Sequence, residues 1–432
     1  MQKKYTKITS HTARSEQAAP TGIRKRAIAW GPAALVASTL LLTATDASAF
    51  LGDSLELFVA ETVAHDDNVF KLSGDRDPRT AIGSSSKADT YYTTQFGANL
   101  DMTVSRQRFI AGASLNETRY QSFSQLNFHG HDAQARWLWQ AGDQWSGQLG
   151  YTEARTLASL SNVQSGNINT FAADALTARR TFGTANYLIT PSWQLSAGLA
   201  QTEQRNSETT RQINNADVAS GNADLYYISN AGNKIGLSLR EENGRMPVHQ
   251  QINGVAYDNS YDQHSAGIVT DWNITAKSHL LARIDQVRRT HRELGQRDWD
   301  GTTAHLTYDW RTTEAFTLTA EAQRDIGNLE ETNTSLVLIK GVALRPTLTL
   351  SEKTRVSALA DYSIRDYVTD PFVALGSPTR SDTVRTLGAV LSYTPLAKLL
   401  IQVTGQHQSR TSNYQFGDYK SNYISIKARY AF

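Results

Sequence analysis

The residues that could do chemistry in this sequence are acidic pairs and histidines, and neither group forms a recognisable catalytic set. Asp66-Asp67 and Asp75-Arg76-Asp77 offer carboxylate oxygens of the kind that bind Ca²⁺. They lack the glycine and the terminal glutamate of a defined calcium loop, which favours the alternative of solvated loop charge. The 10 histidines are scattered, with no adjoining serine and aspartate in a nucleophile–base arrangement. We therefore expect no catalytic residues, no metal site and no cofactor.

The composition excludes further classes of function. The sequence has no cysteine, which rules out disulfides and thiolate sites. Its mean hydropathy of −0.44 is too polar for a helical membrane protein, although 9% of the residues are aromatic. Beyond the N-terminal segment, no stretch approaches the ~20 apolar residues that a spanning helix needs.

The first residues form a segment of their own. Basic residues, including Arg24-Lys25-Arg26, precede an apolar run from Ala27 to Ala44 and the small-residue exit Ala47-Ser48-Ala49. This order predicts a secretory signal peptide over residues 1–49, cleaved after Ala49; the alternative is an anchor that stays attached. The segment carries 7 of the 43 basic and 2 of the 41 acidic residues, leaving a net charge of −3. Nucleic-acid binding would want a net basic domain, so we expect no nucleic-acid partner.

From Leu55 onward, the elements that must position any site are strands. Segments of about ten residues carry apolar side chains on alternate positions and are bounded by turn residues. In the segment that opens near Thr90, one face is apolar and the other polar. The apolar face holds Tyr92, Thr94, Phe96, Ala98, Leu100, Met102 and Val104, and the polar face holds Tyr91, Thr93, Gln95, Gly97, Asn99 and Asp101. Because strand side chains alternate between faces, this pattern indicates a sheet with one apolar face and one polar face.

The strands number about eighteen, and their connections alternate in length. Most turns on one side are tight, with a longer one from Arg345 to Thr354. The other side has long polar segments: His65 to Ala88, Leu157 to Asp174, Glu203 to Gly221, Glu241 to Tyr261 and Asp366 to Asp382. Short periplasmic turns and long outward loops are typical of an outer-membrane β-barrel, and a closed sheet leaves no backbone edge unpaired in lipid. We predict an all-β transmembrane antiparallel barrel over residues 50–432, with both termini periplasmic.

Aromatic residues stand near both kinds of connection, which predicts two interfacial girdles. The group near the short turns is Trp145, Trp193, Trp272, Trp310 and Tyr393, and the group near the long loops is Tyr91, Tyr120, Tyr226, Trp299 and Tyr367. The alternative is that these rings form the core of a soluble β-sandwich.

The chain ends on an alternating strand whose outward set is Ile424, Ile426, Ala428, Tyr430 and Phe432. An apolar stripe with a terminal aromatic resembles the signal that the bacterial barrel-assembly machinery recognises. We therefore expect that machinery, and outer-membrane lipid, as partners.

Three stretches resemble one group of barrels: HDDNVFKL from His65, SDTVRTLGAVLSYTPLAKL from Ser381, and the last 26 residues. They are similar to the EpsL family, outer-membrane proteins associated with exosortase/PEP-CTERM polysaccharide biosynthesis, within the wider set of β-barrel porins. The resemblance implies a role in exopolysaccharide biosynthesis or export, with polysaccharide as substrate and other export proteins as partners. It implies no particular site residues.

The alternation predicts which charged residues line a water-filled bore. The candidates are Arg136, Arg240, Arg283, Asp285, Arg289, Asp309, Glu321, Asp361, Arg365, Lys427 and Arg429. Their signs are nearly balanced, which favours a neutral or mildly charged polymer over a strongly anionic one. The predicted function is a passive conduit for polysaccharide across the outer membrane. The alternatives are a general diffusion porin for small solutes and a structural or accessory barrel that transports nothing.

Overall fold

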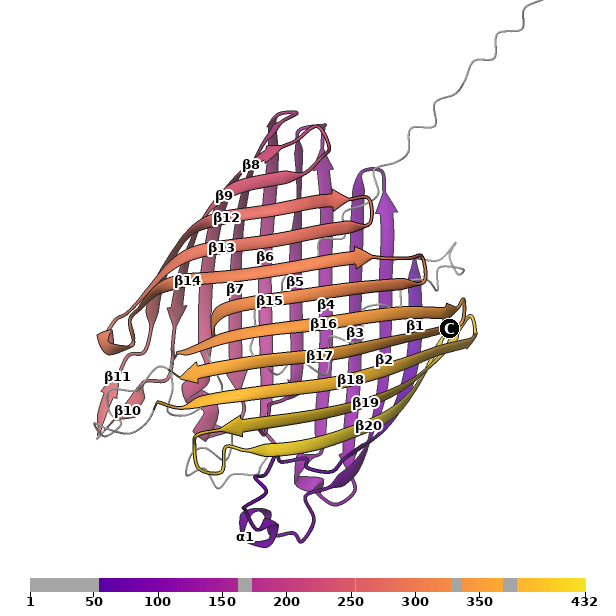
Figure 1. Ribbon diagram of the computed structural model, residues 1–432, viewed down its shortest axis with the longest axis vertical. Coiled ribbons are helices and arrows are strands. Elements are labelled where there is room, and N and C mark those ends of the chain that lie inside the picture. The colour runs from indigo at the N-terminus through magenta and orange to yellow at the C-terminus, as the bar shows by residue number, and fades with distance from the viewer. Residues whose placement is uncertain (1–53, 162–172, 253, 328–335, 368–378) are drawn as a thin grey trace, which may run out of the picture. The chain divides into compact units, whose positions relative to one another are not determined.

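Eighteen strands form one antiparallel sheet that closes on itself, as predicted (Figure 1). The computed structural model describes residues 54–161, 173–252, 254–327, 336–367 and 379–432; the predicted signal peptide lies outside them. The first half of the barrel consists of β1 (Leu55–Asp66), β2 (Asp89–Val104), β3 (Gln107–Tyr120), β4 (Phe128–Ala141), β5 (Trp145–Leu157), β6 (Ala175–Thr190), β7 (Trp193–Asn206), β8 (Ala216–Ile228) and β9 (Lys234–Arg245). The second half consists of β12 (Tyr261–Thr275), β13 (Ser278–His291), β14 (Trp299–Arg311), β15 (Phe316–Gly327), β16 (Val337–Ser351), β17 (Thr354–Tyr367), β18 (Ser381–Leu396), β19 (Leu399–Ser412) and β20 (Tyr419–Ala431).

The remaining elements belong to the longer connections. They are the hairpin of β10 (Gln250–Ile252) and β11 (Val255–Tyr257), the helix α1 (Pro78–Ile82), and the 3₁₀ turns η2 (Ser124–Leu126), η3 (Thr209–Asn214) and η4 (Gly295–Arg297). Among the described residues, no helix is long and apolar enough to cross a membrane.

The last strand closes the barrel because it pairs on both sides, with β19 and with β1. Val63 lies opposite Ile426, and Ala60 lies opposite Arg429. The backbone N–H of Phe432 donates to the carbonyl of Leu57 at 2.8 Å. Every residue of the C-terminal stripe is therefore held in the sheet rather than left to fray.

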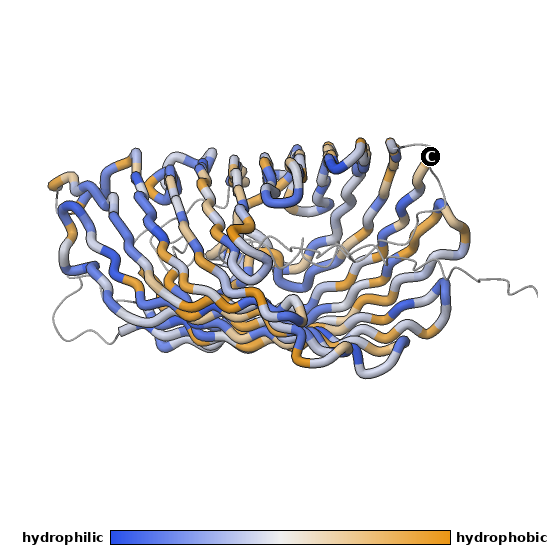
Figure 2. The backbone as a smooth tube through the Cα atoms, turned by 90° about the horizontal axis from the view of Figure 1, so that it is seen from above, coloured by the Kyte–Doolittle hydropathy of each residue, from blue (hydrophilic) through white to orange (hydrophobic). Residues whose placement is uncertain are grey.

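Register assigns each side chain to one of two faces. Leu115 lies opposite Phe96 on the outer face, where both are more than half exposed, and Tyr120 lies opposite Tyr91 on the inner face. Hydrophilic and hydrophobic residues alternate along the strands around the whole barrel (Figure 2). The exposed large apolar side chains of the barrel strands thus belong to the outer face, which is the arrangement that lipid requires.

Several predicted boundaries are wrong. β8 begins at Ala216 rather than near Ala223, and β16 runs through Ser351, so the predicted connection from Arg345 to Thr354 shrinks to residues 352–353. β7 and β9 likewise continue into segments predicted to be loops. The ends of β7 and β9 are polar on both faces, so alternation could not distinguish them from loops. The start of β8 has apolar Ala216 and Val218 on its inner face, against the expected pattern, and the end of β16 does alternate, with Leu348 and Leu350 outward.

One of the two predicted aromatic girdles is present. Trp145, Trp193, Trp272, Trp310 and Tyr393 all face outward near the short turns and are between 37% and 47% exposed. The second girdle is wrong: Tyr91, Tyr120, Tyr226, Trp299 and Tyr367 all occupy inner-face positions. That prediction considered how close each ring lies to a loop, but not whether its position in the strand faces outward or inward.

Candidate functional site

The candidate site is the inner face of the barrel together with the loops over its long-loop end. Register places all eleven predicted lumen residues on this inner face. The structure divides them into separate groups, which the sequence could not show.

The first group spans β9, β12 and β13. Arg283 Nε donates to Asp285 Oδ2 at 2.6 Å, and Arg240 lies 3.1 Å from Glu242. Arg289 covers the ring of Tyr261, with 3.9 Å from the guanidinium carbon to the ring centre. The Tyr261 hydroxyl donates to Glu242 at 2.9 Å. Because Glu242 also lies 3.1 Å from Arg240 and 3.9 Å from Arg289, its carboxylate links these two arginines.

The second group spans β15, β16 and β17. Glu321 forms an ion pair with Arg345, and Asp361 and Arg365 occupy inner positions on the neighbouring strand. The Nε atom of Arg365 is buried and has no hydrogen-bond partner among the described residues. This group therefore includes a cation whose hydrogen bonds are incompletely satisfied.

The remaining candidates lie apart from one another. On β20, Lys427 Nζ donates to Gln95 at 3.2 Å, and Arg429 pairs with Glu56 and covers the Phe58 ring. Asp309 accepts a hydrogen bond from Thr319. Arg136 on β4 forms no ion pair with any residue in the described part of the chain.

Most inner charges thus face an opposite charge on the same strand or the next one. Paired charges on a hydrated wall weaken the field that either sign would produce alone. The inner face is therefore polar, and opposite charges are paired along much of its surface.

Loops from three connections pack into an apolar cluster over the long-loop end. This mouth cluster consists of Val69, Phe70, Leu72, Ala81, Phe123, Leu126 and Leu160. Its members come from the β1–β2, β3–β4 and β5–β6 connections, and the rings of Phe70 and Phe123 meet edge to face at 4.8 Å. Buried apolar contacts of this kind hold loops in one arrangement.

The β5–β6 connection reaches a distant strand. The carbonyl of Ser161 accepts a 2.8 Å hydrogen bond from Arg410 Nη2, on the inner face of β19. Arg410 lies 3.9 Å from Asp382, which is fully buried and also pairs with Arg380 at 2.6 Å. Since β5 and β19 are separated by five strands around the barrel, residues 158–161 cross part of the opening.

Asp66, Asp67 and Asp77 have partners among the described residues. Asp66 lies 2.7 Å from Lys71 Nζ and accepts from Ser421 at 2.8 Å, and Asp67 accepts from the backbone and side chain of Asn422. Asp77 caps the N-terminus of α1. The described residues contain no group of three or more side chains suited to hold a metal ion.

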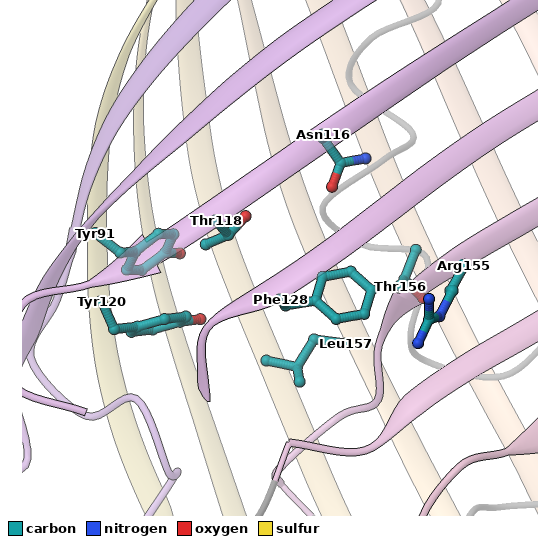
Figure 3. A pocket seen from close by; sticks show the side chains of 8 residues that line it. All are labelled: Tyr91, Asn116, Thr118, Tyr120, Phe128, Arg155, Thr156 and Leu157. Atoms are coloured by element: carbon teal, nitrogen blue, oxygen red, sulfur yellow. The ribbon is translucent and has the colours of Figure 1, made fainter. Parts of the chain in front are cut away.

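A cavity of about 190 Å³ lies at the long-loop ends of β2 to β5, near the mouth cluster. Register places Arg155 and Leu157 on outward positions and the other lining residues on inward ones. Figure 3 shows the rings of Tyr91 and Tyr120 on one side and Phe128, Leu157 and Arg155 on the other. The two tyrosine rings stack with centres 4.6 Å apart. Polar groups from β3 and β5 complete the lining, namely those of Asn116, Thr118 and Thr156.

Arg155 gives this cavity a cation. Its guanidinium carbon lies 5.8 Å from the centre of the Phe128 ring, and no hydrogen bond or ion pair joins it to another described residue. Aromatic faces, an amide and an uncompensated guanidinium are groups that bind rings, hydroxyls and carboxylates.

Sequence reasoning missed several members of the site. Glu242 and Arg345 fell in segments predicted to be connections, and Arg410 was not singled out. That Arg410 faces inward follows from the inward Lys427 and Arg429 only once the register between β19 and β20 is known. The cavity could not have been found, because its residues come from four strands.

Comparison with known proteins adds one family match. A family model described as "Putative beta-barrel porin 2" matches residues 288–432. The chain is a porin-like barrel. No curated protein sequence matches it.

Solved barrels of similar architecture share little sequence with this chain. OccK2 (OpdF) of Pseudomonas aeruginosa is 12% identical, with 89% of this chain and 99% of that chain covered and a TM-score of 0.46. A BenF-like porin from Pseudomonas fluorescens Pf-5 is 10% identical, with 88% and 99% covered and a TM-score of 0.47. OccAB3 of Acinetobacter baumannii is 10% identical, with 88% and 100% covered and a TM-score of 0.45. Identities this low carry no information about solutes.

Proposed function

We propose that this protein is a passive outer-membrane channel for small hydrophilic solutes. The observation that carries the proposal is the inner face, a wall of paired charges within a closed barrel whose apolar side chains face outward. Such a wall supports water and solute without strong preference for one sign. The family match to porins over residues 288–432 supports the same reading.

The loops favour small solutes over a polymer. The mouth cluster and the Ser161–Arg410 contact bring residues 158–161 of the β5–β6 connection across part of the long-loop end. A polysaccharide in transit would have to pass this connection or displace it. We therefore place the export of exopolysaccharide, which the resemblance to the EpsL family implies, second to the diffusion channel.

One observation favours a saccharide as solute under either function. The cavity in Figure 3 offers the faces of Tyr91, Tyr120 and Phe128 beside the amide of Asn116. The C–H faces of sugar rings pack on aromatic rings, while their hydroxyls take hydrogen bonds from amides and hydroxyl groups. We infer that sugars make contact here during passage.

Assembly in the outer membrane is part of the proposal. The C-terminal stripe from Ile424 to Phe432 faces outward, where an assembly factor could read it before closure. Partners in polysaccharide export belong only to the second function. The third reading, a structural barrel that transports nothing, requires a sealed interior.

Liposome swelling separates the three functions. Purified full-length barrel is reconstituted in liposomes, and swelling is followed in glucose, in a trisaccharide and in a dextran of several kilodaltons. The diffusion channel predicts fast swelling in glucose, slower swelling in the trisaccharide and none in dextran. Entry of dextran would favour the polymer conduit, and the absence of swelling in all three would favour the structural barrel.

A further inference from the structure

The outer face carries a groove that the channel function does not use. It has a volume of about 350 Å³ and runs over β14, β15, β16 and β17. Its outward lining residues are Ala304, Leu306, Ala322, Arg324, Lys340, Val342, Tyr362 and Ile364. All of these residues lie outside the bore, on the side that faces lipid.

Side-chain size explains the shape of the groove. Ala304 and Ala322 are the small residues of the set and form its low floor between β14 and β15. Leu306, Val342 and Tyr362 rise around them, and Val342 is 54% exposed. A linear apolar chain fits a trough of this kind, since contact on the floor and walls replaces looser contact with bulk lipid.

Cations gather at one end of the groove. Arg324 and Lys340 lie directly opposite one another on β15 and β16, and Arg385 lies beside Tyr362, with 5.8 Å from its guanidinium carbon to the ring centre. Lys340 pairs with Asp366 at 3.0 Å. No carboxylate of the described residues pairs with Arg324 or Arg385, so the cluster of three cations and one acid stays net positive.

Like charges directly opposite on adjacent strands destabilise a sheet, and Asp366 offsets Lys340 alone. Arg324 is three residues from the end of β15, and Lys340 is three residues from the start of β16, so both lie at the long-loop rim. In an outer-membrane barrel this rim is the extracellular one. The lipid there is a phosphorylated glycolipid, whereas the opposite leaflet consists of phospholipid.

We propose that this groove binds the phosphorylated, multiply acylated glycolipid of the outer leaflet. Its phosphate lies against Arg324, Lys340 and Arg385, and one acyl chain occupies the trough over Ala304 and Ala322. Arginine and lysine clusters beside a membrane surface recognise anionic headgroups in this way. The inference is independent of what passes through the bore.

The test is titration of the full-length barrel in detergent with bisphosphorylated lipid A, followed by native mass spectrometry. Two variants remove the two halves of the site: R324Q/K340Q removes the charge, and A322W fills the floor. Matched controls are R119Q/K420Q, which removes two outward cations of the same rim on β3 and β20, and A111W, which adds the same bulk on the outer face of β3. Heat-modifiable mobility on gels establishes that each variant is folded.

The proposal predicts one tightly bound lipid A in the wild type and in both controls. Binding weakens about ten-fold or more in R324Q/K340Q and in A322W. Dephosphorylated lipid A and phosphatidylglycerol bind at least about ten-fold more weakly than lipid A to the wild type. Equal binding by wild type and both groove variants would overturn the proposal, as would equal binding of the dephosphorylated lipid. A second copy of the chain on the groove, seen as an oligomer that A322W dissociates and lipid A does not, would also overturn it.

Discussion

The carbonyl oxygen of Ser161 accepts a 2.8 Å hydrogen bond from Arg410, although 249 positions separate the two residues in the sequence. This contact joins the start of the β5–β6 connection to the inner wall of β19 at the long-loop end. Substituting Arg410 therefore tests whether this contact limits passage through the opening.

Arg410→Gln is expected to release the β5–β6 connection from β19 and to raise the single-channel conductance. Loss of a hydrogen bond to a charged donor costs about 1.5–3 kcal/mol, enough to populate the released loop. Single-channel recordings in planar bilayers measure the change. Lys420→Gln, a cation at the same rim on the outer face of β20, serves as the control and should conduct like the wild type. Equal conductance of Arg410→Gln and wild type would show that the contact does not limit passage.

Glu242→Gln is expected to shift the channel toward anions. Glu242 offsets Arg240 and Arg289 on the inner face, so its neutralisation leaves both arginines with less compensation. The reversal potential under a KCl gradient reports the selectivity. The matched control is Glu241→Gln, the adjacent residue in the sequence, whose side chain faces outward. A shift of the same size in both variants would contradict the assignment of the two faces.

Leu199→Arg is expected to destabilise the folded barrel in lipid by about 2–4 kcal/mol, because a cation near the membrane midplane is costly there. Leu199 is 73% exposed and lies near the middle of β7 on the outer face. Urea-dependent folding into phospholipid vesicles measures the difference. Gln201→Arg, two positions nearer the rim on the same face, should cost less. Were both substitutions neutral, the outer face would not be in contact with hydrocarbon.

Deletion of Phe432 is expected to lower the yield of folded barrel in the outer membrane while leaving its refolding in vitro nearly intact. The residue faces outward at the end of the stripe that we predict the assembly machinery reads, and its own backbone bond to Leu57 is one among many in the sheet. Heat-modifiable protein in membrane fractions gives the yield. Leu396→Ala, an exposed apolar residue at the same rim but outside β20, should assemble normally. If refolding in vitro fails equally, the residue acts on stability rather than on recognition.

Much of the architecture was predictable because a strand in a barrel obeys one local rule. Alternation along residues such as Tyr91 to Val104 assigns faces without any knowledge of neighbours. The same parity predicts Arg240, Asp285 and Lys427 inside, and register gives them positions on the face opposite the exposed apolar side chains. The start of β8 did not follow the rule, because apolar Ala216 and Val218 lie on its inner face, against Met246 and Tyr261.

The site itself depends on relations that alternation does not encode. The pairing of Glu242 with two arginines, and the approach of Ser161 to Arg410, depend on which strands are neighbours and how the loops fold. The outer groove likewise needs Ala322 to lie between its partners Leu306 and Val342, with Ala304 diagonally beside it on β14. These features depend on the register between neighbouring strands, which the pattern of residues within one strand does not determine.

Steady conductance of the purified full-length barrel in a planar lipid bilayer tests the central claim most directly. The account predicts stable, ohmic channels with only weak preference between K⁺ and Cl⁻, since most charges on the inner face are paired. A barrel that inserts and folds but passes no current would contradict it, as would one that selects strongly for either ion.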